Sequence, residues 1–164
     1  MKLYQLKRSQ WLPLTIEAAW EFFSRPVNLP LITPPWLNMT VRSSLPEKMY
    51  PGMIITYRIQ PVFRIPLTWI TEITHVQRPY FFIDEQRFGP YRFWHHQHSF
   101  TPKNDGIEMH DIVCYGLKFG IIGRLIHRYW VRSRLEDIFD YRKEQLRRWL
   151  PVTITAVPAA SLNR

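Results

Sequence analysis

Strand-like patterns of apolar and polar residues occupy most of the chain before residue 118. Alternation with a period of two is typical of strands that bury one face. The last two strands are joined by residues 102–106, Pro-Lys-Asn-Asp-Gly, which are a strong hairpin signal. Because no long helix separates the strands, the pattern favours an antiparallel meander. The predicted strands are residues 2–12, 37–44, 53–60, 62–76, 79–88, 91–101 and 107–117.

Two short helices are predicted between the first and second strands. Thr15 is a candidate N-cap for the first helix, with Glu17 and Glu21 in its first turns. Pro26 ends this helix, and residues 27–33 form a second one before the Pro34-Pro35 pair.

A helical period replaces the strand pattern from about Gly120. Arg142 falls on the apolar face of this long helix. The helix is expected to end near Pro151, which leaves residues 152–164 as a flexible C-terminal tail. The apolar face consists of Val131, Leu135, Ile138, Phe139, Leu146, Trp149 and Leu150.

These elements predict a fold of the α+β class in one domain, residues 1–151. A curved antiparallel sheet of about seven strands would wrap the long C-terminal helix, with two short helices after the first strand. A sheet curved in this way often leaves a cavity beneath the helix, and the chain is expected to use such a cavity.

The composition agrees with a domain that has a large core. The chain has 164 residues, of which 46% are hydrophobic and 15% aromatic, and its formal net charge is +9. The basic residues form no consecutive run, so we expect a solvated basic surface and no specific nucleic-acid partner. Cys114 is the single cysteine, and no secretory signal or membrane span is recognisable. The expected localisation is cytoplasmic.

The most informative segment is residues 89–100, Gly-Pro-Tyr-Arg-Phe-Trp-His-His-Gln-His-Ser-Phe. As a strand it places Arg92, Trp94, His96, His98 and Phe100 on one face. This face is predicted to look into the cavity. The hairpin predicts four pairs on one side, Trp94 with Tyr115, His96 with Val113, His98 with Asp111 and Phe100 with Met109, and on the other side His96 with Asp84 and Trp94 with Gln86.

Three interpretations of this cluster stay open. The imidazoles could satisfy polar groups in a wet cavity, recognise a polar group of a ligand, or act in acid–base catalysis or metal binding. The catalytic candidates are His96, His98, Asp84 and Asp111. No metal and no other cofactor is expected, because the spacing of the donors is not diagnostic. The candidate ligand-binding residues are Trp69, Asp84, Gln86, Trp94, His96, His98, Phe100, Asp111 and Tyr115.

Residues 118–130 are both apolar and basic. The apolar residues Ile122, Leu125, Ile126 and Tyr129 lie on a face rotated from that of the later helix. This segment is expected to close the cavity mouth, and it could touch an anionic membrane during ligand transfer.

Several of these pieces together resemble a known group of proteins. The Gly-Pro-Tyr of residues 89–91, the Trp-x-His-x-His-x-Phe of residues 94–100 and the segments 84–86, 111–115 and 138–142 resemble a bacterial, uncharacterised branch of the START-like, or SRPBCC, superfamily. The resemblance covers residues 2–150 and implies a helix-grip fold with a ligand cavity. It also implies a functional link to an epimerase-like protein, because members of that branch occur fused to or beside one. Many members have Pro-Phe-Gly before the long helix, whereas this chain has Lys-Phe-Gly at 118–120.

Binding of a small hydrophobic ligand such as a lipid, isoprenoid or polyketide, for transport or presentation, is the leading hypothesis. An enzyme of the polyketide cyclase/dehydratase type is the first alternative, with His–Asp acid–base chemistry in the same cavity. A basic module that docks a membrane or an acidic protein is the second. The sequence contains no Gly-x-Ser-x-Gly elbow, P-loop or dinucleotide fingerprint that would favour other chemistry.

Overall fold

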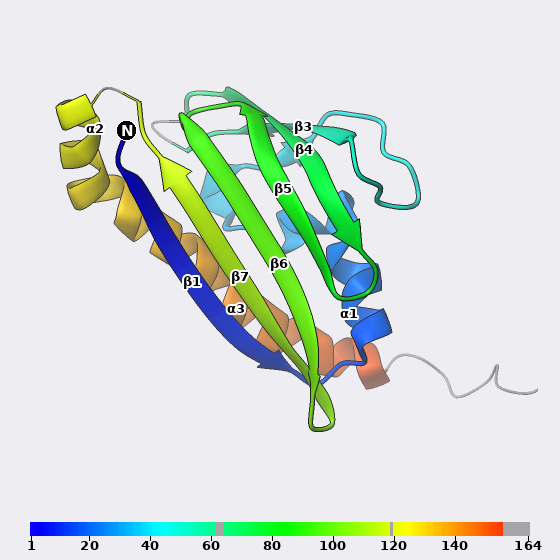
Figure 1. Ribbon diagram of the computed structural model, residues 1–164. Coiled ribbons are helices and arrows are strands. Elements are labelled where there is room, and N and C mark those ends of the chain that lie inside the picture. The colour runs from blue at the N-terminus through cyan, green and yellow to red at the C-terminus, as the bar shows by residue number, and fades with distance from the viewer. Residues whose placement is uncertain (62–63, 119, 156–164) are drawn as a thin grey trace, which may run out of the picture.

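A single antiparallel sheet of seven strands curves over a long C-terminal helix (Figure 1). The computed structural model describes residues 1–61, 64–118 and 120–155, with residues 149–155 described as backbone only. The strand order is β1-β7-β6-β5-β4-β3-β2. The strands are β1 (Leu3–Leu12), β2 (Thr40–Val41), β3 (Met53–Ile59), β4 (Leu67–Gln77), β5 (Phe81–Phe88), β6 (Phe93–Lys103) and β7 (Gly106–Gly116).

The helices lie at the two ends of the chain. Two follow β1, namely α1 (Ile16–Phe23) and the 3₁₀ helix η1 (Pro26–Ile32), and a short 3₁₀ turn η2 (Pro35–Leu37) comes next. The C-terminal helix consists of α2 (Gly120–Ile126), a π-helical segment η3 (His127–Val131) and α3 (Arg132–Thr155). This is the predicted α+β helix-grip arrangement.

Local signals explain where α1 begins and ends. The backbone N–H of Ala18 donates to the Thr15 side-chain oxygen at 3.2 Å, so Thr15 is the N-cap, as predicted. Ala19 and Trp20 are buried against the sheet, and Pro26 follows the end of the helix. Trp20 packs edge-on against Phe82 and Phe100, which anchors α1 to β5 and β6.

The β6–β7 hairpin has the predicted register. Trp94 pairs with Tyr115, His96 with Val113, His98 with Asp111 and Phe100 with Met109. On the other side Asp84 pairs with His96, also as predicted. The ladder ends at the next pair, Glu85 and His95, so the predicted pair of Trp94 with Gln86 was wrong. Asn104 has a φ of 53°, a left-handed conformation that asparagine tolerates in a tight turn.

Two predicted strands are shorter than expected. The strand predicted at residues 37–44 is reduced to β2, because Pro35–Leu37 form a 3₁₀ turn and Asn38 has a φ of 44°. The strand predicted at residues 62–76 begins at Leu67, after Arg64 with a φ of 57° and Pro66. Residues 62–63 lie outside the described residues. In both places local backbone turns override a favourable strand pattern.

The C-terminal helix also differs from the prediction. It continues to Thr155, beyond the expected end at Pro151, since the fixed φ of proline is compatible with a helix although one hydrogen bond is lost. Of the predicted tail, residues 156–164 lie outside the described residues. The π-helical segment adds a residue to one turn, which accounts for the rotation between the apolar faces of α2 and α3.

The core fills the space between the concave face of the sheet and α3. Val113 of β7 and Leu135, Phe139 and Leu146 of α3 are each at most 5% exposed. In the described part of the chain, no helix is long and apolar enough to span a bilayer.

Candidate functional site

A cavity of about 350 Å³ lies between the curved sheet and the C-terminal helix. Its wall is largely apolar, with contributions from the sheet, from the short helices and from α3. This size falls in the range of ~300–1,000 Å³ that is common for small-molecule sites. The apolar and aromatic lining includes Ile55, Trp69, Phe82, Trp94, Leu135 and Ile138.

The structure brings five of the nine predicted ligand-binding residues to this cavity. Trp69, Asp84, Trp94, His96 and His98 line it. Trp69 and Trp94 meet edge-on with ring centres 5.1 Å apart, and the indole N–H of Trp69 donates to the Thr71 hydroxyl at 2.9 Å. These contacts hold both indoles as a fixed part of the wall.

The other four predicted residues do not line the cavity. Phe100 is 2% exposed and belongs to the core under α1, where Phe23 stacks on it. Gln86 lies next to the turn between β5 and β6. Its side-chain N–H donates to the Tyr91 carbonyl oxygen, and its side-chain oxygen accepts a hydrogen bond from the Tyr91 backbone N–H. Tyr115 packs between β1 and the C-terminal helix. Asp111 contacts the imidazoles of His96 and His98 but is not part of the cavity wall.

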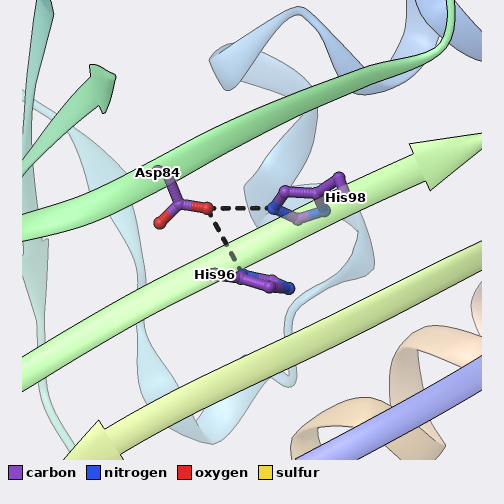
Figure 2. A group of neighbouring side chains, drawn as sticks. All are labelled: Asp84, His96 and His98. Atoms are coloured by element: carbon purple, nitrogen blue, oxygen red, sulfur yellow. Dashed lines mark hydrogen bonds and ion pairs between the residues drawn. The ribbon is translucent and has the colours of Figure 1, made fainter. Parts of the chain in front are cut away.

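Two histidines and two aspartates form one buried cluster on β5, β6 and β7. His96 lies 3.0 Å from Asp111 Oδ1 through Nε2 and 3.3 Å from Asp84 Oδ2 through Nδ1. His98 lies 2.9 Å from Asp84 Oδ2 through Nε2, and its Nδ1 lies 2.9 Å from Asp111 Oδ1 at an angle unsuited to a hydrogen bond. Figure 2 shows both imidazoles converging on Asp84. We call these four residues the His–Asp cluster.

Electrostatics inside the His–Asp cluster favour the charged forms of Asp84, Asp111 and His98. Burial alone would raise the pKa of Asp84 and of Asp111, but the two imidazoles outweigh burial and hold both carboxyl pKa values well below their usual range. Burial likewise acts to lower the pKa of His98, and the two carboxylates outweigh it, so this pKa is raised. Asp84, Asp111 and His98 are therefore held in their charged forms as an ion network inside the cluster.

This pairing limits the chemistry of the imidazoles. Each of their four ring nitrogens faces a carboxylate oxygen within 3.3 Å. A general base needs a free nitrogen within reach of its substrate. The ring nitrogen of the cluster that lacks a hydrogen bond, His98 Nδ1, is buried and lies 2.9 Å from Asp111 Oδ1. Donor atoms of Asp84, His96 and His98 also lie within 4.8 Å of one another, a spacing that a metal ion could bridge only with neutral imidazoles. The raised pKa of His98 works against that form.

Tyr57 and Arg142 are lining residues that the sequence analysis did not propose for the site. Tyr57 is 5% exposed on β3, and burial, with a further contribution from the charge of Asp84, raises its pKa so that the phenol keeps its proton. Arg142 is 8% exposed on α3 with its guanidinium 4.8 Å from the Phe139 ring centre. The sequence did carry a signal for Arg142, because this charged residue falls on the apolar face of the helix, where a charge is costly unless it has a partner.

Lys118 and residues 120–130, which form α2 and most of η3, border the cavity and carry an exposed apolar surface. Lys118, Gly123 and Ile126 contribute to the cavity wall. Arg124 and Arg128 are exposed on the same segment, and no acidic residue occurs in the sequence between Asp111 and Glu136. The exposed apolar side chains, between 43% and 74% accessible, are Ile121, Ile122, Leu125, Ile126 and Tyr129.

Comparisons with known proteins identify the fold. No family model and no curated protein matches the chain. Solved structures match over nearly its whole length. Protein TTHA0849 from Thermus thermophilus is 15% identical, with 92% of this chain and 99% of that chain covered and a TM-score of 0.66. The major latex-like protein 151 from Panax ginseng is 11% identical, with 90% and 97% covered and a TM-score of 0.65.

A third match concerns part of a larger protein. A nucleoside-diphosphate sugar epimerase from Corynebacterium glutamicum is 20% identical to the chain, with a TM-score of 0.62. The match covers 92% of this chain and 30% of the epimerase chain. At such identities these likenesses establish the helix-grip fold alone.

Proposed function

We propose that the chain is a START-like, SRPBCC-type protein that binds a small, largely apolar ligand in the cavity between the sheet and α3. The observation that carries this proposal is the cavity itself: about 350 Å³ of space with an apolar and aromatic wall under the long helix. Cores normally pack without such voids, so an apolar hollow of this size favours an occupant.

Burial of apolar surface would supply the affinity. At ~25 cal/mol per Å², a ligand that loses ~250 Å² of apolar surface gains about 6 kcal/mol, before the costs of association are subtracted. Trp69 and Trp94 are held edge-on in the wall, so little side-chain order has to be created on binding. The resemblance in the sequence and the shared fold support lipids, isoprenoids and polyketides as ligand classes.

Filling the cavity is the sharpest test of ligand binding. Ile138→Trp adds a ring from α3 into the cavity, whereas Ile54→Trp adds the same ring on the outer face of β3, where Ile54 is 49% exposed. Native mass spectrometry and solvent extraction of the purified wild type should detect a bound apolar molecule. Titration with the uncharged dye Nile red should give saturable binding to the wild type and to Ile54→Trp, and none to Ile138→Trp. A wild type that carries no ligand and binds no dye would contradict the proposal.

We further propose that the segment formed by Lys118, α2 and η3 delivers or collects the ligand at an anionic membrane. The support is its exposed apolar side chains beside Lys118, Arg124 and Arg128, with no acidic residue nearby in the sequence. Apolar insertion together with basic charge is the combination that binds acidic bilayers. Sedimentation with phosphatidylcholine vesicles should require added phosphatidylserine, weaken with salt, and be lost in Ile122→Glu but kept in Ile54→Glu. Equal sedimentation of both variants would refute the membrane step.

A functional link to an epimerase-like protein belongs to the same proposal. It is supported by the resemblance in the sequence and by the likeness to part of the Corynebacterium glutamicum epimerase chain. Binding between the purified chain and an epimerase-like protein of the same organism, measured by calorimetry, tests this link; no binding would remove it and leave the ligand proposal intact.

A further inference from the structure

Among the described residues that line the cavity, Arg142 is the arginine that is buried and has no carboxylate partner, whereas Lys118, which also has none, is exposed and donates to the Gly89 carbonyl oxygen at 3.3 Å. Arg25 is exposed and pairs with Glu21 at 3.2 Å, and Arg134 is exposed and lies 3.9 Å from Asp137. Arg142 is 8% exposed, and no carboxylate of the described residues lies within ion-pair distance of it. Every Asp and Glu of the sequence lies in the described part of the chain, so no further acidic side chain is available to pair with Arg142.

The arginine is also short of hydrogen bonds. Its Nε is buried and has no partner among the described residues. Guanidinium groups stay charged at physiological pH, and a buried charge is costly unless it is paired and hydrogen-bonded. The acidic residue that lines the cavity, Asp84, is already committed to His96 and His98. The charge of Arg142 therefore has no counter-charge in direct contact among the described residues.

The surroundings of Arg142 suit a ligand with two different ends. The guanidinium lies 4.8 Å from the centre of the Phe139 ring, a cation–π contact that restrains it. Ile138 and Leu135, from the preceding turns of α3, line the same cavity and offer apolar surface. A guanidinium fork matches the oxygens of a carboxylate or a phosphate in two parallel hydrogen bonds.

We propose that the ligand is an amphiphile with an anionic oxygen head group, a carboxylate or a phosphate, which Arg142 binds while the apolar tail fills the rest of the cavity. This inference rests on the proposed function, because it specifies the ligand class of the same cavity. It assigns to Arg142 a role in specificity: the residue selects acids over their neutral analogues of equal apolar length.

Matched probes separate the charge of the head group from the apolar tail. The delipidated chain is titrated by calorimetry with dodecanoate and dodecyl phosphate, each below its critical micelle concentration, and with methyl dodecanoate below its solubility limit. The wild type is expected to bind at least one anionic probe at least about tenfold more tightly than the ester, which corresponds to about 1.4 kcal/mol. The anion that binds more tightly identifies the head group as carboxylate or phosphate.

Variants assign that preference to a residue. Arg142→Gln should bind the anionic probe about as weakly as the ester, with its ester affinity unchanged, and Arg142→Lys should retain part of the preference. Arg148→Gln, on the exposed side of the same helix, is the control and should bind as the wild type does. Thermal melting verifies that each variant is folded.

The possible failures are distinguishable. If the wild type binds the ester as tightly as both anions, the head-group inference is wrong and the apolar-ligand proposal stands. If Arg142→Gln lowers the affinities for the anionic probe and for the ester equally, Arg142 shapes the cavity and does not distinguish charged from neutral head groups. That result also overturns the inference. If no probe binds and the Nile red titration is negative as well, the proposed function itself fails.

Discussion

Replacing Asp111 by Asn tests the energetic account of the His–Asp cluster. The Asp111 side chain is 7% exposed, and its Oδ1 lies 3.0 Å from His96 Nε2 and 2.9 Å from His98 Nδ1. Asparagine has nearly the same shape, so the variant removes the charge without opening a cavity. Breaking a buried ion pair typically costs ~3–5 kcal/mol, and the amide oxygen can still accept one hydrogen bond, so we expect a loss of about 3 kcal/mol.

The size of this loss should depend on pH. The pKa of His98 is raised in the folded chain, so the stabilisation it contributes is fully present below its unfolded pKa of 6.5 and is lost as the pH rises through the raised folded value. The pKa of Asp111 is lowered, so its own stabilisation is present above an unfolded value of 3.8 and does not change between about pH 6 and about pH 9. The loss in Asp111→Asn should therefore be larger at about pH 6 than at about pH 9.

Urea unfolding followed by tryptophan fluorescence measures the loss of unfolding free energy at each of the two pH values by linear extrapolation. At about pH 6 the melting temperature should fall by about 6–12 °C, since ~1 kcal/mol shifts a domain of this size by ~2–4 °C. Asp105→Asn, in the exposed β6–β7 turn, is the control and should stay within ~0.5 kcal/mol of the wild type. A loss below ~1 kcal/mol at about pH 6, or an equal loss at both pH values, would refute the ion-network account.

Three further predictions concern the core, the first helix and the unpaired arginine. Phe100→Ala should cost ~3–5 kcal/mol in urea unfolding yet leave Nile red affinity within about twofold, because Phe100 is core and not cavity wall; a much weaker dye affinity in the folded variant would contradict this. Thr15→Ala should lower stability by ~1 kcal/mol through loss of the N-cap, with Thr15→Ser as the control that keeps it; equal losses in both would exclude capping. Arg142→Met should raise the unfolding free energy of the delipidated protein by at least ~1 kcal/mol, because the aliphatic stem is kept and an unpaired charge is removed; a loss of stability would mean that Arg142 is satisfied within the fold.

Patterns read over many residues predicted the architecture well. The hairpin register followed from the Asn-Asp-Gly turn and from alternation on both strands, since a slip by one residue would turn His96 and His98 to the wrong face. The helix-grip layout followed from the change of period near Gly120. These signals are local or strictly periodic, so a single sequence displays them.

Other features depend on contacts that the sequence does not display. The strand expected at residues 37–44 is reduced to Thr40–Val41 because Asn38 takes a left-handed conformation after η2, a local turn that the alternation of apolar and polar residues does not display. Phe100 was placed in the cavity because it shares a face with His96 and His98, yet α1 covers that end of the face through Phe23 and Trp20. Alternation identifies the face of a strand but not which stretch of that face another element covers.

The His–Asp cluster and Arg142 are both buried and charged, but only the cluster finds its partners within the described part of the fold. In the cluster each imidazole nitrogen lies within 3.3 Å of a carboxylate oxygen, so the charges of the four residues are paired within the fold, although His98 Nδ1 makes no hydrogen bond. Arg142 lies on the facing helix with no such partner among the described residues, so its desolvation is uncompensated within the fold. Of the cavity's buried charges, Arg142 is therefore the one whose partner has to come from outside the chain, and the side of the cavity formed by α3, more than the imidazoles of β6, carries the information about what binds there.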